Sequence, residues 1–157
     1  MAIYLQIDDI EGNVTEGAHE GWTEIDSLQW GVGRAIASAI GRAADRESSQ
    51  PSISEITVTK LMDEASPHFF SEACVGEGKT MTIEFCKTGE AAEVYMAYEL
   101  EDCMISGYSV SSGGDRPTES ISLSFTKIEM TYTPTEKDGS LGNPIPAGYD
   151  MVAGAKV

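Results

Sequence analysis

The sequence predicts a mainly β protein folded as a single domain, and three observations support this. Short stretches in which apolar and polar side chains alternate recur along the 157 residues, as in strands with one buried and one exposed face. Only residues 66–76 carry both the start and the stop signals of a helix. Helices do not alternate with the strands along the chain, so the βαβ rhythm of a parallel sheet is missing. A chain of this length is large enough for one hydrophobic core.

Alternating apolar residues predict the strands. These lie at residues 3–7, 22–32, 51–59, 81–85, 94–110 and 115–134. On the second of them, Leu28, Trp30 and Val32 share one face. The polar, glycine-containing stretch 9–21 is typical of a loop. Its acidic residues do not follow the order of an EF-hand calcium loop, so a solvated loop is the favoured interpretation.

The stretch 115–134 contains a change of phase. Its apolar residues fall on odd positions up to Phe125 and on even positions from Ile128 onward. One extra residue near 126–127, a β-bulge, would keep a single inward face and would bend the strand. A long bent strand can serve two sheets, as in a barrel or an orthogonal sandwich.

The helix at residues 66–76 is predicted from its ends and its apolar side. Ser66 is a favourable N-cap, Pro67 suits the first helical position, and Gly76 suits the end. An apolar stripe on this helix is expected to lie on the sheet. The stripe consists of Phe69, Phe70, Ala73 and Cys74.

The chain is strongly acidic, with 10 Lys and Arg against 26 Asp and Glu and a formal net charge of −16. This charge argues against nucleic acid, whose phosphates need basic contacts, and against anionic membrane surfaces. No apolar run approaches the roughly 20 residues that span a bilayer. The N-terminal residues lack the basic region, apolar core and cleavage site of a secretory signal peptide. We therefore expect no nucleic-acid partner, no membrane insertion and no cleaved signal peptide.

Residues for metal or catalytic chemistry do not stand in recognisable patterns. Cys74, Cys86 and Cys103 are odd in number and lack metal-ligand spacing, and we expect them to be buried, reduced thiols. His19 and His68 have no Cys or acid nearby at metal-ligand spacing. We therefore expect no metal, no cofactor and no catalytic residues, and the protein is not expected to be an enzyme.

Residues 73–80 read ACVGEGKT and approximate a phosphate-binding loop, with Ala73 in place of the first Gly. Such a loop follows a strand and opens a helix, whose N-terminus holds the phosphate. Here the predicted helix comes first and a strand follows, which favours a helix end plus a turn. Nucleotide binding through Lys79 is the weaker alternative.

Five stretches carry a resemblance to a known family. The longest are PSISEITVTKLMDEASPHFF at residues 51–70 and DRPTESISLSFTKIEMTYTP at residues 115–134. Shorter ones are the opening IYLQIDDIEGNVT, RESS at residues 46–49 and AGYDM at residues 147–151. In order and spacing they resemble the haemolysin-coregulated protein (Hcp) family, the inner-tube subunits of type VI secretion systems. The resemblance covers essentially the whole chain.

The resemblance implies a β-barrel of two sheets with one short flanking α-helix and a long extended loop. Residues 1–157 would form a single tube domain, with the extended loop at 33–50. The Gly and Pro content of residues 135–157 separately indicates an irregular C-terminal tail. Six subunits would close into a ring, and rings would stack into a tube that carries effector proteins in its pore. Sheath, spike and small effector proteins would be partners. The protein would be cytoplasmic before firing and secreted afterwards.

In this family the extended loop contacts neighbouring rings or subunits, which makes Arg34, Ile36, Ile40 and Arg42 the candidate contacts. The equally open alternative is that the two isoleucines fold back onto their own barrel. A second function is also compatible with the resemblance, namely a free carrier that binds effector proteins and has no essential tube role. An enzymatic function is the third alternative, and the sequence supports it least.

Overall fold

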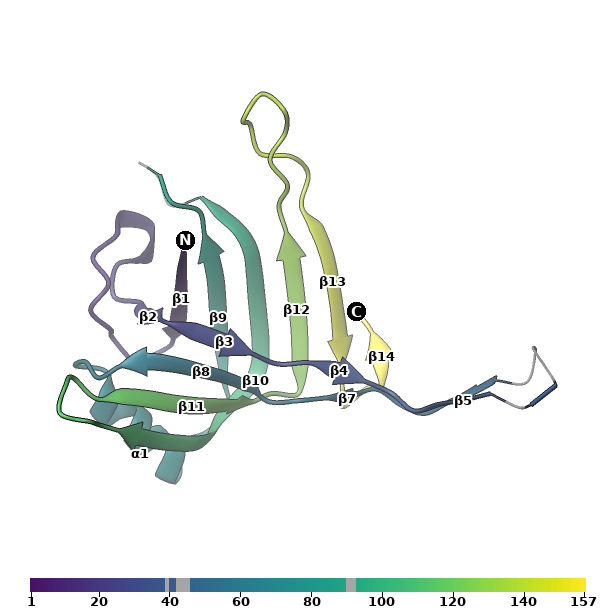
Figure 1. Cartoon of the computed structure of the whole chain (residues 1–157), viewed down its shortest axis with the longest axis horizontal. Coiled ribbons are helices and arrows are strands. Elements are labelled where there is room, and N and C mark those ends of the chain that lie inside the picture. Colours follow the sequence, from purple (N-terminus) through teal and green to yellow (C-terminus); the bar gives the residue numbers. More distant parts are fainter. Residues whose placement is uncertain (39, 42–45, 90–92) are drawn as a thin grey trace.

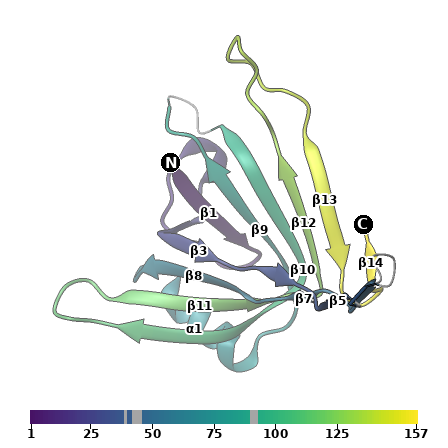
Figure 2. The same ribbon diagram turned by 45° about the vertical axis from the view of Figure 1, so that its right-hand side comes forward.

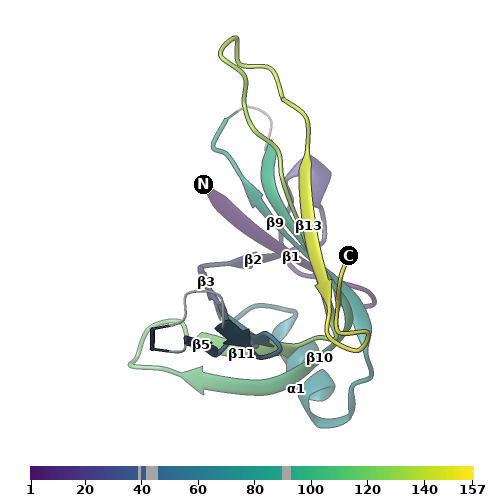
Figure 3. The same cartoon turned by 90° about the vertical axis from the view of Figure 1, so that its right-hand side faces the viewer.

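The computed structural model describes residues 1–38, 40–41, 46–89 and 93–157, and it contains two antiparallel sheets that meet at a steep angle (Figures 1 and 3). The first sheet has the spatial order β2 (Thr23–Ile25), β1 (Ala2–Ile7), β9 (Lys79–Cys86), β10 (Val94–Ser111), β12 (Lys127–Tyr132), β13 (Ile145–Asp150) and β14 (Ala155–Lys156). The second has the order β10, β11 (Thr118–Ser124), β8 (Ile56–Leu61) and β3 (Ser27–Gln29). The mainly β fold predicted from the alternating residues is confirmed.

The long strand β10 belongs to both sheets. Up to Glu101 its residues pair with β12, and from Met104 onward they pair with β11. Between these two residues Asp102 has a φ of 49°, in the left-handed region, and the register with β9 shifts between Leu100 and Cys103. Such irregularities bend a strand. The bend lets one continuous strand leave the first sheet and enter the second.

The change of phase predicted near residues 126–127 lies opposite this bend. Residues 115–134 serve both sheets, as predicted, because β11 lies in the second sheet and β12 in the first. The structure differs in having a break at Phe125 and Thr126 instead of a bulge within one strand. The N–H of Thr126 donates to the carbonyl oxygen of Glu101 at 3.2 Å. The chain therefore passes from the second sheet to the first beside the bend in β10.

The expected barrel is wrong in one respect: the two sheets of the described residues do not close. The strand ladder ends at β3 in the second sheet and at β14 in the first. β2 and β3 follow each other along the chain, so the sheets meet at this corner through the backbone and not through a strand ladder. On the other side, β12, β13 and β14 extend the first sheet beyond the point where β10 leaves it. This extension leaves a free outer edge.

The hydrophobic core fills the angle between the two sheets. Its fully buried members include Leu5, Ile56, Val58, Phe69, Met81, Ile83, Leu100, Ile121 and Leu123. They come from alternate positions on five strands and from one position on the helix, which is the pattern of sheets with one inward face.

The α-helix of the described residues, α1 (Ser66–Val75), packs beside β10 under the second sheet (Figure 2). It ends before Gly76, as predicted, and a Cβ at that position would lie 2.4 Å from the carbonyl oxygen of Glu72. The predicted N-cap is wrong, because Ala65 occupies that position and Ser66 is the first helical residue. The hydroxyl of Ser66 takes part in a buried network instead.

The apolar stripe of α1 is narrower than predicted. Phe69 is fully buried, whereas 60% of Phe70 is exposed and Cys74 is also exposed. The Phe70 ring only touches the edge of Tyr108, with 6.4 Å between ring centroids. A helix of ten residues is too short to be stable alone, so Phe69 is its main anchor.

Replacing Phe69 by alanine is expected to destabilise the fold by about 3–5 kcal/mol, because a fully buried aromatic side chain leaves a cavity. The matched control is Phe70→Ala on the same turn, for which we expect about 1 kcal/mol or less. Urea unfolding followed by circular dichroism measures both. Equal losses for the two variants would contradict the role of Phe69 as the anchor of α1.

All three cysteines lie in the described part of the chain, and all are free thiols. Cys86 and Cys103 are buried, as predicted, but Cys74 is exposed because it lies on the outer side of α1. Burial raises the pKa of Cys103 to about 12 and that of Cys86 to about 11, and neighbouring carboxylates add to both shifts. The two buried thiols are therefore protonated at neutral pH.

A buried ionic network ties the start of α1 to the second sheet. Lys60 and Glu119 are opposite residues on β8 and β11, both fully buried, and the Lys60 Nζ lies 2.6 Å from the Glu119 Oε1. Lys60 also contacts Asp63 Oδ1 at 2.9 Å, and Ser66 donates to Glu119 at 2.7 Å. Tyr108 donates to the second carboxylate oxygen. Beside the start of α1, the buried interior therefore contains charged and polar side chains and not only apolar ones.

The pKa of the Glu119 carboxyl lies below its ordinary value. Burial alone would raise it, but hydrogen bonds from Lys60, Tyr108 and Ser66 stabilise the ionised form more strongly. Glu119 is therefore ionised at neutral pH in the folded protein.

Two short strand pairs lie outside the sheets. β4 (Val32–Gly33) pairs with β7 (Ser52–Ile53), and β5 (Ile36–Ser38) pairs with β6 (Arg46–Ser48). Residues 33–50 thus include a hairpin that projects well beyond both sheets (Figure 1). The expected irregular tail is corrected as well. Residues 135–157 contain β13 and β14, because β13 pairs with β12 along the outer edge of the first sheet.

Candidate interaction surface

Paired hydrogen bonds hold the base of the projecting hairpin. The N–H of Ala35 donates to Ser49 Oγ at 3.0 Å, and the N–H of Ser49 donates to the Ala35 carbonyl at 2.9 Å. Nearer the sheets, Gly31 and Ser54 repeat this exchange with two bonds of 2.9 Å. Serine side chains thus complete the pairing where the strand ladder is interrupted. Together with the pairing of β4 and β7, these four bonds connect the two strands at the base of the hairpin.

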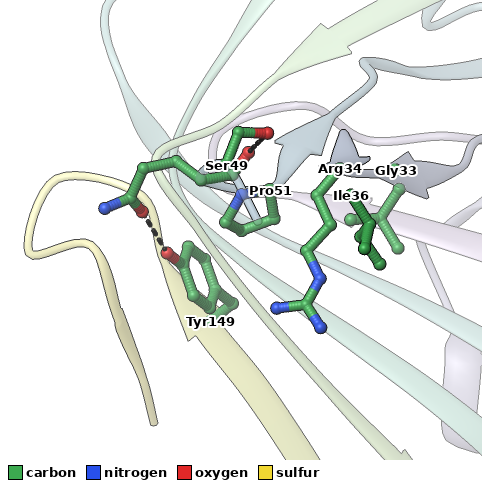
Figure 4. A pocket seen from close by; sticks show the side chains of 8 residues that line it. Gly33, Arg34, Ile36, Ser49, Pro51 and Tyr149 are labelled. Carbon is green, nitrogen blue, oxygen red and sulfur yellow. Dashed lines mark hydrogen bonds between the residues drawn. The ribbon is translucent and has the colours of Figure 1, made fainter. Parts of the chain in front are cut away.

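An open groove of about 730 Å³ lies beside this base, and we call it the hairpin groove. Figure 4 shows the rings of Pro51 and Tyr149 on one side and the side chains of Arg34 and Ile36 on the other. Its lining residues are Val32, Gly33, Arg34, Ile36, Ser49, Gln50, Pro51 and Tyr149. The Tyr149 hydroxyl donates to Gln50 Oε1 at 3.1 Å, which connects β13 to the hairpin.

A second hollow of about 220 Å³ continues the hairpin groove toward the first sheet. The two share Val32, Pro51 and Tyr149. The other residues of the second hollow are Trp30, Ile53, Ile128, Met130, Ala147 and Gly148. Nearly all of these are apolar, and 61% of Val32 and 47% of Ile36 are exposed. The result is a continuous apolar surface on an otherwise strongly acidic protein, of the kind that marks contacts with other proteins.

The structure places the predicted contact residues differently. Arg34 and Ile36 line the hairpin groove. Ile40 lies farther out on the hairpin and is fully exposed. Arg42 lies outside the described residues. Ile40 therefore does not fold back onto its own sheets, whereas Ile36 is 47% exposed and lies in a groove that it shares with Tyr149 of β13.

Sequence reasoning missed the opposite wall of the groove. The sequence predicts Pro51 only as the start of a strand, and it places Tyr149 in a tail expected to be irregular. These two residues are 98 positions apart in the chain, and the pairing of β13 with β12 brings them together. The AGYDM stretch at residues 147–151 was the available signal for Tyr149.

The interpretation of residues 73–80 as a helix end plus a turn agrees with the structure. α1 precedes β9, which is the reverse of the order in a phosphate-binding loop. The Lys79 Nζ contacts Glu72 Oε1 at 2.8 Å. This lysine is held by a carboxylate of the preceding helix and does not face a helix N-terminus.

The fold gives His19 neighbours that the sequence spacing does not predict. No Cys or acid stands near it at metal-ligand spacing in the sequence, yet in the fold its ring is buried between Glu16, Glu84 and Cys86. Burial lowers the pKa of the imidazole, but hydrogen bonds to Glu16 and Glu84 raise it above its ordinary value overall. Three of these residues, His19, Glu84 and Cys86, carry groups that could ligate a metal ion.

The fold and the surface define a class of protein: within the described residues, an open two-sheet β protein with one covering helix, a projecting hairpin and an open apolar groove beside it. No helix in the described ranges is long and apolar enough to cross a membrane. Residues 4–132 match the family model described as "Type VI secretion system effector, Hcp", and the chain therefore belongs to the Hcp family. The resemblance seen in the sequence is confirmed.

Similar proteins agree with this assignment. The chain is 24% identical to protein hcp1 of Pseudomonas aeruginosa over 154 residues, which cover 95% of this chain and 94% of that protein. A solved structure described as a type six secretion system protein is 27% identical, with a TM-score of 0.91 and 99% of each chain covered. Hcp1 from Salmonella typhimurium has the same fold, with 23% identity, a TM-score of 0.81 and coverage of 99% and 98%.

Proposed function

We propose that this protein is a structural subunit of a type VI secretion inner tube, and that six copies close into a ring whose stacked copies carry effector proteins in the pore. Membership of the Hcp family supports this role. The observation that carries it is the apolar hairpin groove with the hairpin beside it. A head-to-tail contact between identical subunits needs two different surfaces that complement each other.

The hairpin and the groove are suitable as two such surfaces. Ile36 and Ile40 present apolar side chains on the projecting hairpin. Val32, Pro51 and Tyr149 offer apolar surface in the groove. Burial of apolar area is the main driving force of association between proteins. We place Arg34, Ile36 and Ile40, together with Arg42 of the same segment, at contacts between subunits or rings.

Free sheet edges provide a further means of assembly. β3 ends the second sheet and β14 ends the first within the described residues. An edge strand offers unpaired N–H and C=O groups, which can pair with a strand of another chain. The role is structural, and we assign no catalytic step to it.

The net charge predicts how assembly responds to salt. Six copies would carry a formal charge of −96, six times the −16 of one chain. Repulsion between like charges opposes ring closure, and at physiological salt it is screened over about 8 Å. We therefore expect rings and stacked rings to become more stable as the salt concentration rises.

Sedimentation of the purified protein at low and high salt measures this, and electron microscopy tests the proposed ring directly. The expected result is a ring of six with a central pore, and a larger sedimenting fraction at high salt. A lone protomer at every concentration and salt tried would overturn the tube role. Rings that fall apart on adding salt would instead mean that ion pairs hold the contact.

A further inference from the structure

Three side chains with metal-ligating groups meet on the outer face of the first sheet, far from the hairpin groove. His19 comes from the 3-10 turn η1 (Gly17–His19), and Glu84 and Cys86 are two positions apart on β9. The His19 Nε2 lies 2.7 Å from Glu84 Oε2 and 3.7 Å from Cys86 Sγ. All three ligand atoms lie within 4.8 Å of one another. The proposed assembly uses none of them.

We infer that His19, Glu84 and Cys86 form a binding site for a divalent transition-metal ion, and that Zn²⁺ fits it best. An imidazole nitrogen, a carboxylate oxygen and a thiolate sulfur are the three ligand types that Zn²⁺ takes in proteins. Calcium and magnesium prefer sites made entirely of oxygen ligands. The donor set therefore selects a softer ion.

The spacing of the ligand atoms suits tetrahedral coordination. Bonds of about 2.1 Å to nitrogen and 2.3 Å to sulfur place these two atoms about 3.6 Å apart, and the observed separation of Nε2 and Sγ is 3.7 Å. The Glu84 oxygen would move from 2.7 Å to about 3.4 Å from Nε2 to make room for the ion. Glu84 has the freedom to do so, because its side chain is 23% exposed.

The surroundings of His19 resemble a supported metal ligand. Its Nδ1 lies 2.5 Å from Glu16 Oε2, on the side of the ring away from the proposed ion. A carboxylate in this position fixes the ring and makes the other nitrogen a better ligand. The Tyr4 and Trp22 rings lie against the imidazole, each with 4.7 Å between centroids. Glu16, Tyr4 and Trp22 thus hold the imidazole in one orientation.

The two protons that a bound metal ion must displace can be assigned to atoms of this cluster. Binding one Zn²⁺ displaces the proton shared between His19 Nε2 and Glu84 and the thiol proton of Cys86. The ion keeps three protein ligands, and a water completes the fourth position. Both carboxylates of the cluster are partly exposed, Glu16 by 31% and Glu84 by 23%, which gives the ion and the water a path from solvent.

The test uses the full chain with Co²⁺ as a spectroscopic probe and with Zn²⁺ in competition with a chromophoric chelator. We expect one ion per chain and a near-ultraviolet charge-transfer band from the bond between thiolate and Co²⁺. Cys86→Ala should abolish the band, and Glu84→Gln should weaken Zn²⁺ binding. Glu16→Gln, which removes only the carboxylate behind the imidazole, should weaken binding by about 10–100-fold.

Cys74→Ser is the matched control, because it removes the exposed thiol of α1 and should leave the band and the affinity unchanged. Circular dichroism checks that each variant is folded, and the partly exposed Glu84 makes its variant the safer one if Cys86→Ala unfolds. Zn²⁺ bound equally well by wild type and both ligand variants would overturn the inference. So would the absence of a charge-transfer band. The cluster would then be a hydrogen-bonded histidine with a purely structural role.

Discussion

Replacing Lys60 by methionine is expected to destabilise the protein by about 3–5 kcal/mol at neutral pH, because the change removes the cation but leaves Glu119 ionised in a fully buried position. Removing one member of a buried ion pair leaves a charge that neither water nor a partner compensates. Urea unfolding at a fixed protein concentration measures the loss, because assembly makes stability depend on concentration.

The matched control is Lys127→Met. Lys127 and Glu101 form a pair of the same kind on the surface, at 3.3 Å, with side chains 23% and 47% exposed. Such exposed pairs contribute about 0–1 kcal/mol. If Lys60→Met costs no more than Lys127→Met, the buried network does not hold the start of α1 as described.

The pH dependence of these variants has a definite sign. In the wild-type protein the pKa of Glu119 is lowered on folding, so its contribution is present above the ordinary glutamate pKa and is lost as the pH falls through the lower native value. Without Lys60 the buried carboxylate is unpaired, and acid relieves it by protonation. The stability difference between wild type and Lys60→Met should therefore shrink in acid. Lys60→Met combined with Glu119→Gln should recover part of the loss at neutral pH.

Changing Ile36 and Ile40 together to aspartate is expected to abolish tubes while leaving rings. Both side chains are exposed on the hairpin, so the fold of the protomer should be unaffected. Burying an isoleucine at a contact is worth roughly 1.5–3 kcal/mol. Each new carboxylate would in addition face the acidic surface of a neighbouring copy.

Electron microscopy and sedimentation at high salt measure this result. The matched control changes both residues to leucine, which keeps the apolar surface and the charge, and tubes should persist. An unchanged unfolding midpoint for the aspartate variant shows that the protomer is intact. If its tubes form as in the wild type, the hairpin is not the contact between rings. If its rings are lost too, the hairpin acts within the ring.

Much of the fold could be predicted because it depends on local patterns. Alternating side chains locate most of the strands, and the change of phase near residues 126–127 marks the point where the chain passes between sheets. The strands of the C-terminal tail could not be predicted, because Pro146 and Gly148 obscure the strand signal of β13. Its pairing with β12 is a tertiary effect that outweighs their low strand propensity. The open edge that follows from this pairing could not be predicted from the strands one by one.

The buried ion pair left a signal in the sequence. Lys60 is two positions after Val58 and so lies on the same inward face of β8 as Ile56 and Val58. Glu119 is two positions before Ile121 and lies on the inward face of β11. Both charges therefore fall on inward positions. Two opposite charges on the inward faces of separate strands indicate that they pair. The positions of Glu84 and Cys86 on one face of β9 were equally readable. Their meeting with His19, 65 residues from Glu84, was not, because it depends on how the loop at residues 9–21 folds over the sheet.

The three free thiols have a consequence for a family whose members leave the cell. All three cysteines are free, so the fold is held by its packed core and by buried ionic contacts such as that of Lys60 with Glu119, and not by a disulfide. Cys86 and Cys103 are buried and have raised pKa values, so an oxidant in solution would meet the exposed Cys74 first. Moving the protein from a reducing to an oxidising medium would therefore modify this exposed thiol of α1 before the other two.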